Sequence, residues 1–269
     1  MKHSLKLFLI AVGMLSGLYK HGGVAQIIPQ ADTLAQQQVP PDTTVFSGSL
    51  GLTNNGFSII PSFSLNSPAL LVQLSYRRNR FSIDPDIRLT PNGKRGAMLF
   101  WFRYYPIQKS HFSLRVGAHP SFLLQTREIV EKGLTQEITQ MRRFLAWELV
   151  PYYQVNKHWG FGLYYLQGNG LQPDGPQTTH FVNLNTSISH IRLGGKFRLK
   201  LIPAVYYLNL DGYSGTYFTA TVIASHTKLP ISLQSIVNQT FQSNLPGNVD
   251  FLWNASIHYH FSSKLVSTK

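Results

Sequence analysis

The chain has 269 residues, of which 13% are charged and 43% are hydrophobic, and its formal net charge is +13. The charged share is about half that of a soluble globular protein, and the hydrophobic share is not raised to match. This mixture disfavours an ordinary soluble domain. It suits a transmembrane β-barrel, in which half of each strand faces lipid and half a polar lumen, although a secreted β-sandwich is an alternative. The absence of cysteine excludes disulfides, a lipoprotein anchor and thiolate chemistry.

The first 25 residues have the pattern of a secretory signal peptide. Lys2 and Lys6 give a positive start, residues 5–18 are largely apolar, and small residues precede a cleavage site after Ala25. The apolar core is shorter than the roughly 20 residues that a membrane-spanning helix needs. We therefore expect export rather than a helical anchor. Residues 26–45 are rich in Gln and Pro and predict a flexible periplasmic segment.

Strand-like runs follow one another through the remainder of the chain. The clearest is 251–261, in which Phe251, Trp253 and Ile257 alternate with Asn254, Ser256 and His258. Strict alternation with aromatic residues at both ends is typical of a strand that crosses a membrane. The twelve predicted strands are 57–65, 69–77, 80–89, 96–105, 111–125, 138–153, 158–167, 179–191, 196–209, 215–226, 230–241 and 249–261. The predicted fold is all-β: a transmembrane, antiparallel, up-and-down barrel of about 12 strands, with 10–14 compatible with the pattern.

The connections between these runs alternate in length, as the short periplasmic turns and longer external loops of such barrels do. The predicted periplasmic turns are compact, at 78–79, 106–110, 156–157, 192–195 and 227–229. The predicted external loops are 90–95, 126–137, 168–178, 211–214 and 242–248, and most of them are longer. The first connection, at 66–68, is short for an external loop. The predicted domains are the signal peptide 1–25, the flexible segment 26–45, the barrel 46–261 and a short tail 262–269.

Proline is the main conflict with this prediction. Pro61, Pro85, Pro120, Pro151 and Pro203 fall inside predicted strands, where each removes a ladder hydrogen bond. All five have outward parity, so we expect bulges or locally interrupted pairing at these points. The fourth strand carries a second misfit, because its alternation places Trp101 in the lumen.

The segment RFSIDPDIRLTPNGKRGAMLFWFRYY, residues 80–105, resembles a hairpin of small, largely uncharacterised outer-membrane β-barrel proteins of Gram-negative bacteria. The preceding NNGFSIIPSFSL is similar in style. The resemblance implies a fold and a location in the cell outer membrane, with lipid and lipopolysaccharide as surroundings. It brings no catalytic residues.

The charges predicted to face inward are mostly basic. The candidate lumen-lining residues are Asp84, Asp86, Arg88, Arg103, Arg115, Arg142, Glu148, Arg198 and Lys200. They suit a porin-like channel for small anionic solutes. They equally suit a filled barrel held by cross-strand ion pairs, or a barrel that binds a partner through its loops. The pattern does not distinguish these, and it leaves the oligomeric state open. External Lys94, Arg95 and Lys132 are candidates for contact with lipopolysaccharide phosphates.

An outer-membrane lipid hydrolase or acyltransferase is the enzymatic alternative. The nearest nucleophile and base candidates are Ser121 with His119, and Ser256 with His258 and His260, but no residue in the pattern supplies the orienting third group. We therefore assign no catalytic residue. His258 and His260 share a face, yet two ligands alone make a weak metal site, so we expect neither a metal nor a cofactor. Export and outward aromatic residues argue against a nucleic-acid partner.

Overall fold

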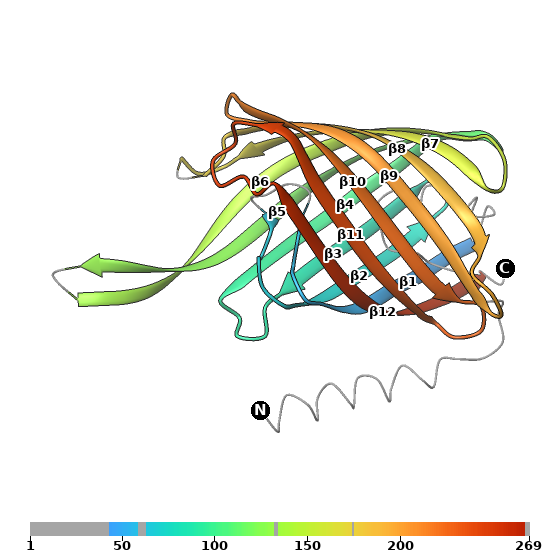
Figure 1. Ribbon diagram of the computed structural model, residues 1–269, viewed down its shortest axis with the longest axis horizontal. Coiled ribbons are helices and arrows are strands. Elements are labelled where there is room, and N and C mark those ends of the chain that lie inside the picture. Colours follow the sequence, from blue (N-terminus) through green and yellow to red (C-terminus); the bar gives the residue numbers. More distant parts are fainter. Residues whose placement is uncertain (1–42, 59–62, 132–133, 174, 267–269) are drawn as a thin grey trace, which may run out of the picture.

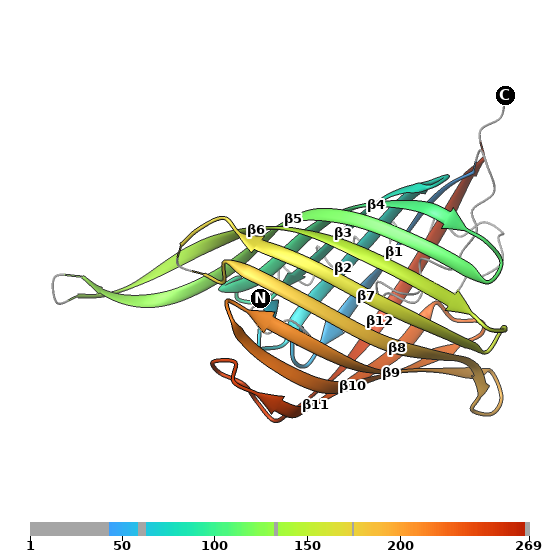
Figure 2. The same cartoon turned by 90° about the horizontal axis from the view of Figure 1, so that it is seen from above.

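The twelve strands form a closed antiparallel barrel in which every strand pairs with its sequence neighbours and β1 pairs with β12 (Figure 1, Figure 2). A computed structural model describes residues 43–58, 63–131, 134–173 and 175–266. The strands are β1 (Thr43–Thr53), β2 (Ala69–Arg78), β3 (Phe81–Leu89), β4 (Arg95–Gln108), β5 (Phe112–Glu131), β6 (Leu134–Gln154), β7 (Trp159–Gly170), β8 (Thr178–Arg192), β9 (Phe197–Leu210), β10 (Tyr213–His226), β11 (Ile231–Ser243) and β12 (Phe251–Val266). No helix in these residues is long and apolar enough to cross a membrane.

The predicted barrel class, strand number and antiparallel order are confirmed. The alternation in β12 is also confirmed, because Trp253 and Ile257 are about half exposed on the outer wall while Asn254, Ser256 and His258 are buried inside. Trp101 is 6% exposed and faces inward, as the period of its strand predicted. The predicted signal peptide, Pro61, Lys132 and residues 267–269 of the predicted tail lie outside the described residues.

The predicted first strand, 57–65, is wrong. The first strand is β1, which begins at Thr43, inside the segment predicted to be flexible, and the connection between β1 and β2 therefore spans residues 54–68. Phe57 and Leu65 in this connection are 8% and 1% exposed, so the aromatic period that resembled a lipid face belongs to a loop that packs inward. The amide of Leu65 donates to the carbonyl of Gly56 at 2.8 Å. The first external connection is thus long, whereas the connection between β9 and β10 at the same end consists of Asp211 and Gly212 alone.

The predicted loop 126–137 is largely strand. β5 and β6 stay paired from Phe112 opposite Tyr153 to Glu131 opposite Leu134. β4 accompanies β5 only as far as Gln125, and β7 accompanies β6 only from Phe144. A two-stranded ribbon therefore projects beyond the barrel wall (Figure 1).

Of the prolines predicted to lie inside strands, the four that the structure describes each interrupt pairing on one side and leave the register unchanged. At Pro85 the pairing with β2 stops at Gln73 and resumes at Tyr76, while Pro85 still pairs with Phe100 of β4. Pro120, Pro151 and Pro203 show the same one-sided interruption. The expectation of bulges or locally interrupted pairing is confirmed. One register shift, between Tyr104 and Ile107, lies at Pro106 of β4, and two others lie between Ile188 and Ile191 and between Thr216 and Tyr217.

Candidate functional site: the lumen

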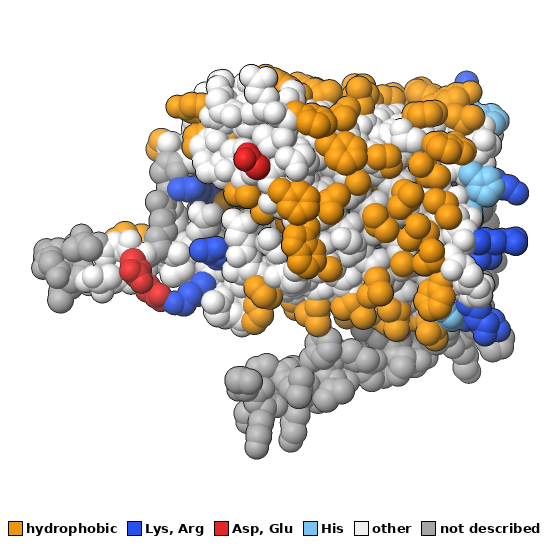
Figure 3. Space-filling view, in the orientation of Figure 1, with side chains coloured by type: hydrophobic (Ala, Val, Ile, Leu, Met, Phe, Trp, Pro, Cys, Tyr) orange, Lys and Arg blue, Asp and Glu red, His pale blue; other side chains and the backbone are white. Residues whose placement is uncertain are grey.

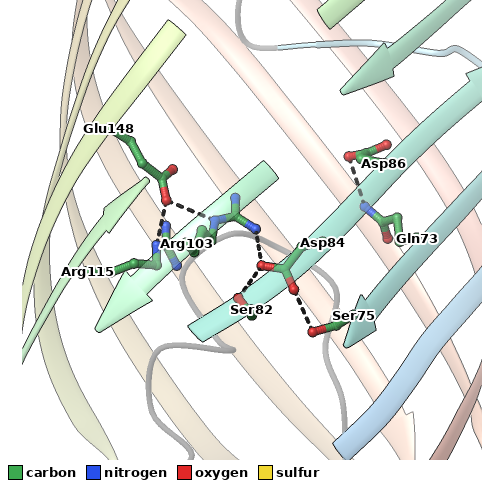
Figure 4. Close-up of polar contacts among 8 residues, drawn as sticks. All are labelled: Gln73, Ser75, Ser82, Asp84, Asp86, Arg103, Arg115 and Glu148. Carbon is green, nitrogen blue, oxygen red and sulfur yellow. Dashed lines mark hydrogen bonds and ion pairs between the residues drawn. The ribbon is translucent and has the colours of Figure 1, made fainter. Parts of the chain in front are cut away.

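A chain of ion pairs crosses the inside of the barrel between β3, β4, β5 and β6 (Figure 4). Arg103 of β4 donates from Nη1 to Asp84 at 2.9 Å and from Nε to Glu148 at 2.9 Å. Arg115 of β5 donates from Nε to the same Glu148 oxygen at 2.7 Å. The side chains of Arg115 and Glu148 have no exposed surface. We call Asp84, Arg103, Arg115 and Glu148 the ion cluster; its two cations are balanced by its two anions.

Short polar side chains complete the shell of the ion cluster. The hydroxyl groups of Ser75 and Ser82 donate to the two oxygens of Asp84 at 2.6 and 2.8 Å. Buried charge is tolerated when it is both paired and hydrogen-bonded. The small inward residues of β2 and β3 leave room for this arrangement, which makes the ion cluster a fixed element rather than a set of mobile pore-lining charges.

A glycine determines how Arg103 reaches Glu148. Gly117 of β5 lies opposite Arg103 on one side and opposite Glu148 on the other, so the two charged side chains meet over a position without a side chain. A Cβ atom at Gly117 would lie 3.0 Å from Cγ of Arg103 and 3.1 Å from Oε1 of Glu148. Both contacts are tighter than ordinary packing, so Gly117 is part of the site.

We call the end of the barrel with the connection 54–68 the loop end, and the opposite end, which carries the connection between β2 and β3, the turn end. A second ion pair lies closer to the loop end. Asp86 accepts two hydrogen bonds from Arg88, from Nε at 3.0 Å and from Nη2 at 2.9 Å, and a third from Gln73 at 3.3 Å. The remaining candidates are not brought together with these. Arg142 lies next to Gly175 in the loop after β7. Arg198 is half-buried near the turn end, and Lys200 is buried on β9, on another part of the wall.

Two further side chains of the lumen were not among the predicted site residues. Arg77 is 5% exposed, and its guanidinium lies 4.0 Å from the ring centroid of Tyr105. Trp101 lies under the guanidinium of Arg103 at 4.4 Å and packs against His119 at 4.0 Å between ring centroids. The alternation of β2, with Gln73, Ser75 and Arg77 on one face, was the signal for Arg77. No sequence signal indicates the stacking on Trp101.

A cavity of about 310 Å³ occupies the loop-side half of the lumen, above the ion cluster. Its aromatic lining comes from β4, β6, β7 and β8, on one side of the barrel, and from the inward-folded first loop. Its polar lining includes the Asp86–Arg88 pair, Gln234 and His258. The residues with aromatic rings are Phe57, Phe63, Trp101, Phe144, Tyr164 and Phe181.

Loop residues close part of this half of the lumen. Leu245, from the loop between β11 and β12, is 6% exposed and belongs to a buried cluster that contains Trp101, Phe181 and Tyr206. Leu65, from the first loop, packs in a second cluster with Leu123 and Phe144. The loop-side lumen is therefore mainly apolar and aromatic, whereas its floor is ionic.

The serine and histidine candidates lie inside the lumen. Ser256 and His258 are hydrogen-bonded at 2.9 Å between Oγ and Nε2, but Nδ1 of His258 has no hydrogen-bond partner in the described part of the chain. His260 contacts Ser232 at 2.7 Å instead. Ser121 Oγ likewise lacks a partner there. A nucleophile–base contact without an orienting group does not make a triad. The described residues contain no group of three or more side chains suited to hold a metal ion.

The outer wall carries apolar side chains over its full circumference. Leu52, Phe102, Trp147, Leu184, Val205 and Leu233 are 42–58% exposed although each sits within a strand. Figure 3 shows hydrophobic side chains covering the visible wall between two polar ends. A closed barrel with such a wall satisfies its backbone internally and presents an apolar surface to lipid.

No family model matches the chain, and no curated protein sequence matches it. Solved structures with a similar shape are outer-membrane proteins. A KdgM porin matches with a TM-score of 0.49 at 12% identity, over 80% of this chain and 99% of the porin. LpxR from Salmonella typhimurium matches with 0.46 at 8% identity, over 80% and 100%. The CymD monoaromatic hydrocarbon channel matches with 0.45 at 10% identity, over 94% and 97%. Because these TM-scores are below 0.5, we argue neither function nor site from them.

Proposed function

We propose that this chain is an outer-membrane β-barrel, exported with a cleaved signal peptide, that takes a small molecule with an aromatic or aliphatic body into the loop-side half of its lumen. The observation that carries the proposal is the aromatic-walled cavity of about 310 Å³ above the ion cluster. Small-molecule sites are mostly apolar cavities of about 300–1,000 Å³ with a few placed polar groups. Asp86, Arg88, Gln234 and His258 are among the polar residues of this lining, which also include Asn183, Asn185 and Asn254.

The charge distribution favours this class of ligand over a free inorganic anion. Arg103 and Arg115, which are both buried, are neutralised by Asp84 and Glu148. A paired guanidinium attracts an entering anion much less than an unpaired one, because the carboxylate beside it contributes the opposite field. The aromatic rings, by contrast, remain available on the wall of the cavity.

The four tryptophans allow a direct test. Trp147, Trp159 and Trp253 are 42%, 44% and 52% exposed on the outer wall, and only Trp101 faces the lumen. A variant with the three outer tryptophans replaced by Phe reports the lumen alone. With this variant in lipid vesicles, the probes are phenol, benzoate and benzylamine, which are neutral, anionic and cationic aromatic molecules. We expect a saturable change of Trp101 emission with phenol and no change with glycerol.

A matched pair of substitutions separates cavity binding from partition into lipid. Ala146→Phe places a ring inside the cavity, where Ala146 is 5% exposed, whereas Ala255→Phe adds the same ring on the outer wall. We expect Ala146→Phe to abolish the saturable signal and Ala255→Phe to retain it. Equal signals in the two variants, or no saturation with any probe, would contradict the proposal.

An anion-preferring pore is the second candidate function. The basic residues with inward parity include Arg77, Arg88, Arg103, Arg115, Arg142, Arg198 and Lys200, against the acidic Asp84, Asp86 and Glu148. If this excess lines open water, the reversal potential in a salt gradient across a planar bilayer reports anion preference, and it shifts toward cations in Arg198→Ala. A non-conducting or non-selective barrel that binds phenol supports the first proposal.

A further inference from the structure

Basic side chains are concentrated at the end of the barrel where the five short turns lie. The turns join β2 to β3, β4 to β5, β6 to β7, β8 to β9 and β10 to β11, and all five are fully described. None of them contains Asp or Glu. Figure 3 shows Lys, Arg and His side chains gathered at this end of the molecule. The exposed members are Arg78, Arg80, Lys109, Lys157, Arg192, Lys196, Lys228 and Lys264, with His111, His158 and His190; we call them the basic rim.

The opposite end has a mixed charge. Lys94 forms an ion pair with Glu137 on the projecting ribbon, and Arg95 donates to the carbonyl of Leu65 at 2.9 Å. Asp211 and Asp250 are exposed at the same end. In the described part of the chain no ion pair involves a member of the basic rim. The loop-end cations proposed for lipopolysaccharide are therefore partly engaged, and among the described residues the basic rim carries more exposed cations than the loop end.

The turns that carry the basic rim are tied to one another. The amide of Gln154 donates to the carbonyl of His111 at 2.7 Å, and Nδ1 of His111 contacts the carbonyl of Gln154 at the same distance. Nδ1 of His190 contacts the carbonyl of Lys157 at 3.0 Å. The amide of Thr227 donates to the carbonyl of Lys196 at 2.8 Å. These bonds fix the spacing of the cations along the rim before anything binds.

Aromatic side chains set the depth of the rim in the membrane. Tyr153, Trp159 and Phe197 are 51%, 44% and 51% exposed on the outer wall, a few residues from the turns that carry Lys157 and Lys196. Aromatic girdles of transmembrane barrels lie at the level of the lipid head groups. The basic rim, which lies immediately beyond this girdle, is consequently placed at the height of the lipid phosphates.

We propose that the basic rim is a binding surface for the phosphate groups of anionic phospholipids in the leaflet that faces the short turns. The proposal rests on the membrane-spanning orientation given above. Lysine and arginine near an anionic surface are attracted to its phosphates over about a Debye length. An acidic soluble partner would satisfy the charge but not the aromatic girdle, which requires a membrane interface next to the cations.

The test is lipid selectivity of the full mature chain, reconstituted in equal amounts of phosphatidylglycerol and phosphatidylcholine and released for native mass spectrometry. We expect phosphatidylglycerol to dominate among the retained lipids. In the variant Lys157→Gln, Lys196→Gln, Lys228→Gln this preference should fall by about tenfold, since each cation near the surface contributes separately. The wild-type preference should also fall in about 0.5 M salt, where the Debye length is short.

The matched control removes the same charge at the other end, with Lys94→Gln, Arg95→Gln and Arg143→Gln. We expect this control to keep the phosphatidylglycerol preference. Unchanged preference in the rim variant, or an equal loss in both variants, would overturn the proposal. Heat-modifiable migration and insertion into vesicles are measured first on every variant. Failure of the wild-type chain to insert refutes the membrane-spanning barrel itself, whereas normal insertion without selectivity refutes only the role of the basic rim.

Discussion

Replacing Glu148 by Gln tests whether the ion cluster holds the barrel wall together. Glu148 is 1% exposed, and its Oε1 accepts from Arg103 and Arg115 at 2.9 and 2.7 Å. The substitution keeps the shape of the side chain but leaves two buried guanidinium groups with Asp84 as the anion of the cluster. Breaking a buried ion pair by removing one partner costs about 3–5 kcal/mol, because the remaining charge stays desolvated. We expect a loss of that size in the free energy of unfolding of Glu148→Gln.

The measurement is urea unfolding of the refolded barrel in lipid vesicles, followed by tryptophan emission. Glu137→Gln is the matched control, since Glu137 also pairs with a cation, Lys94, but is about half exposed. Exposed pairs contribute about 0–1 kcal/mol. The double variant Glu148→Gln, Arg115→Met restores a balanced cluster of Arg103 and Asp84, and should recover part of the loss. A Glu148→Gln barrel as stable as the control would refute the reasoning, and would indicate that water reaches the ion cluster.

Four further outcomes follow from the same geometry. Arg at Ile257, on the outer wall, should cost about 2–4 kcal/mol, whereas Arg at Ser256, facing the cavity, should be tolerated better; equal loss of folding would mean that the register of β12 is wrong. Gly117→Ala should destabilise the barrel by about 1–3 kcal/mol through overpacking, and Gly168→Ala, whose Cβ would meet its neighbours at 3.5 Å, should be close to neutral in the same unfolding assay. Brominated lipids should quench Trp147, Trp159 and Trp253 but spare Trp101, as measured on single-tryptophan variants; strong quenching of Trp101 would reverse its assigned face. Burial raises the pKa of the Asp211 carboxyl, but hydrogen bonds from Thr178 and Gln177 outweigh burial and lower this pKa overall. The stabilisation from Asp211 is therefore present above the unfolded pKa of about 3.9 and is lost as the pH falls through the folded pKa. Amide exchange at Gln177 and Thr178 should accelerate at that pH, and Asp211→Asn should remove the pH dependence.

The alternation of side chains predicts which face of a strand is inside, and it did so even where the residue type argued against it. Trp101 is the clearest example, because its parity outweighed its aromatic character. The same rule failed at 57–65, where a two-residue period occurs in a loop. Period two shows only that alternate residues face opposite ways. It does not show that the segment pairs with neighbours, and the real strand β1, with Gly48 and Gly51 in its middle, has a weaker apolar signal.

The contacts within the lumen require more than parity. Arg103 lies between Asp84 and Glu148 because of three registers, those of β3 with β4, β4 with β5 and β5 with β6. The last two of these registers also place Gly117 opposite both Arg103 and Glu148. A one-residue error in any register would separate these charges. Register is fixed by the whole set of cross-strand contacts and turns, so no local pattern in the sequence specifies it.

The inward parity of several basic residues suggests a positively charged lumen, but the ion pairs change this interpretation. Arg103 and Arg115 lie inside the barrel, yet each has a carboxylate within 3 Å, so their charge is cancelled locally and adds little to the field in the lumen. The exposed cations of the described residues are mostly those of the basic rim, whose turns contain no carboxylate. The electrostatic attraction of a protein for its surroundings is strongest next to the charges that have no counter-ion beside them. Under the two proposals made above, those surroundings are the membrane surface at the turn end, while the aromatic cavity at the loop end selects its ligand by shape and apolar contact.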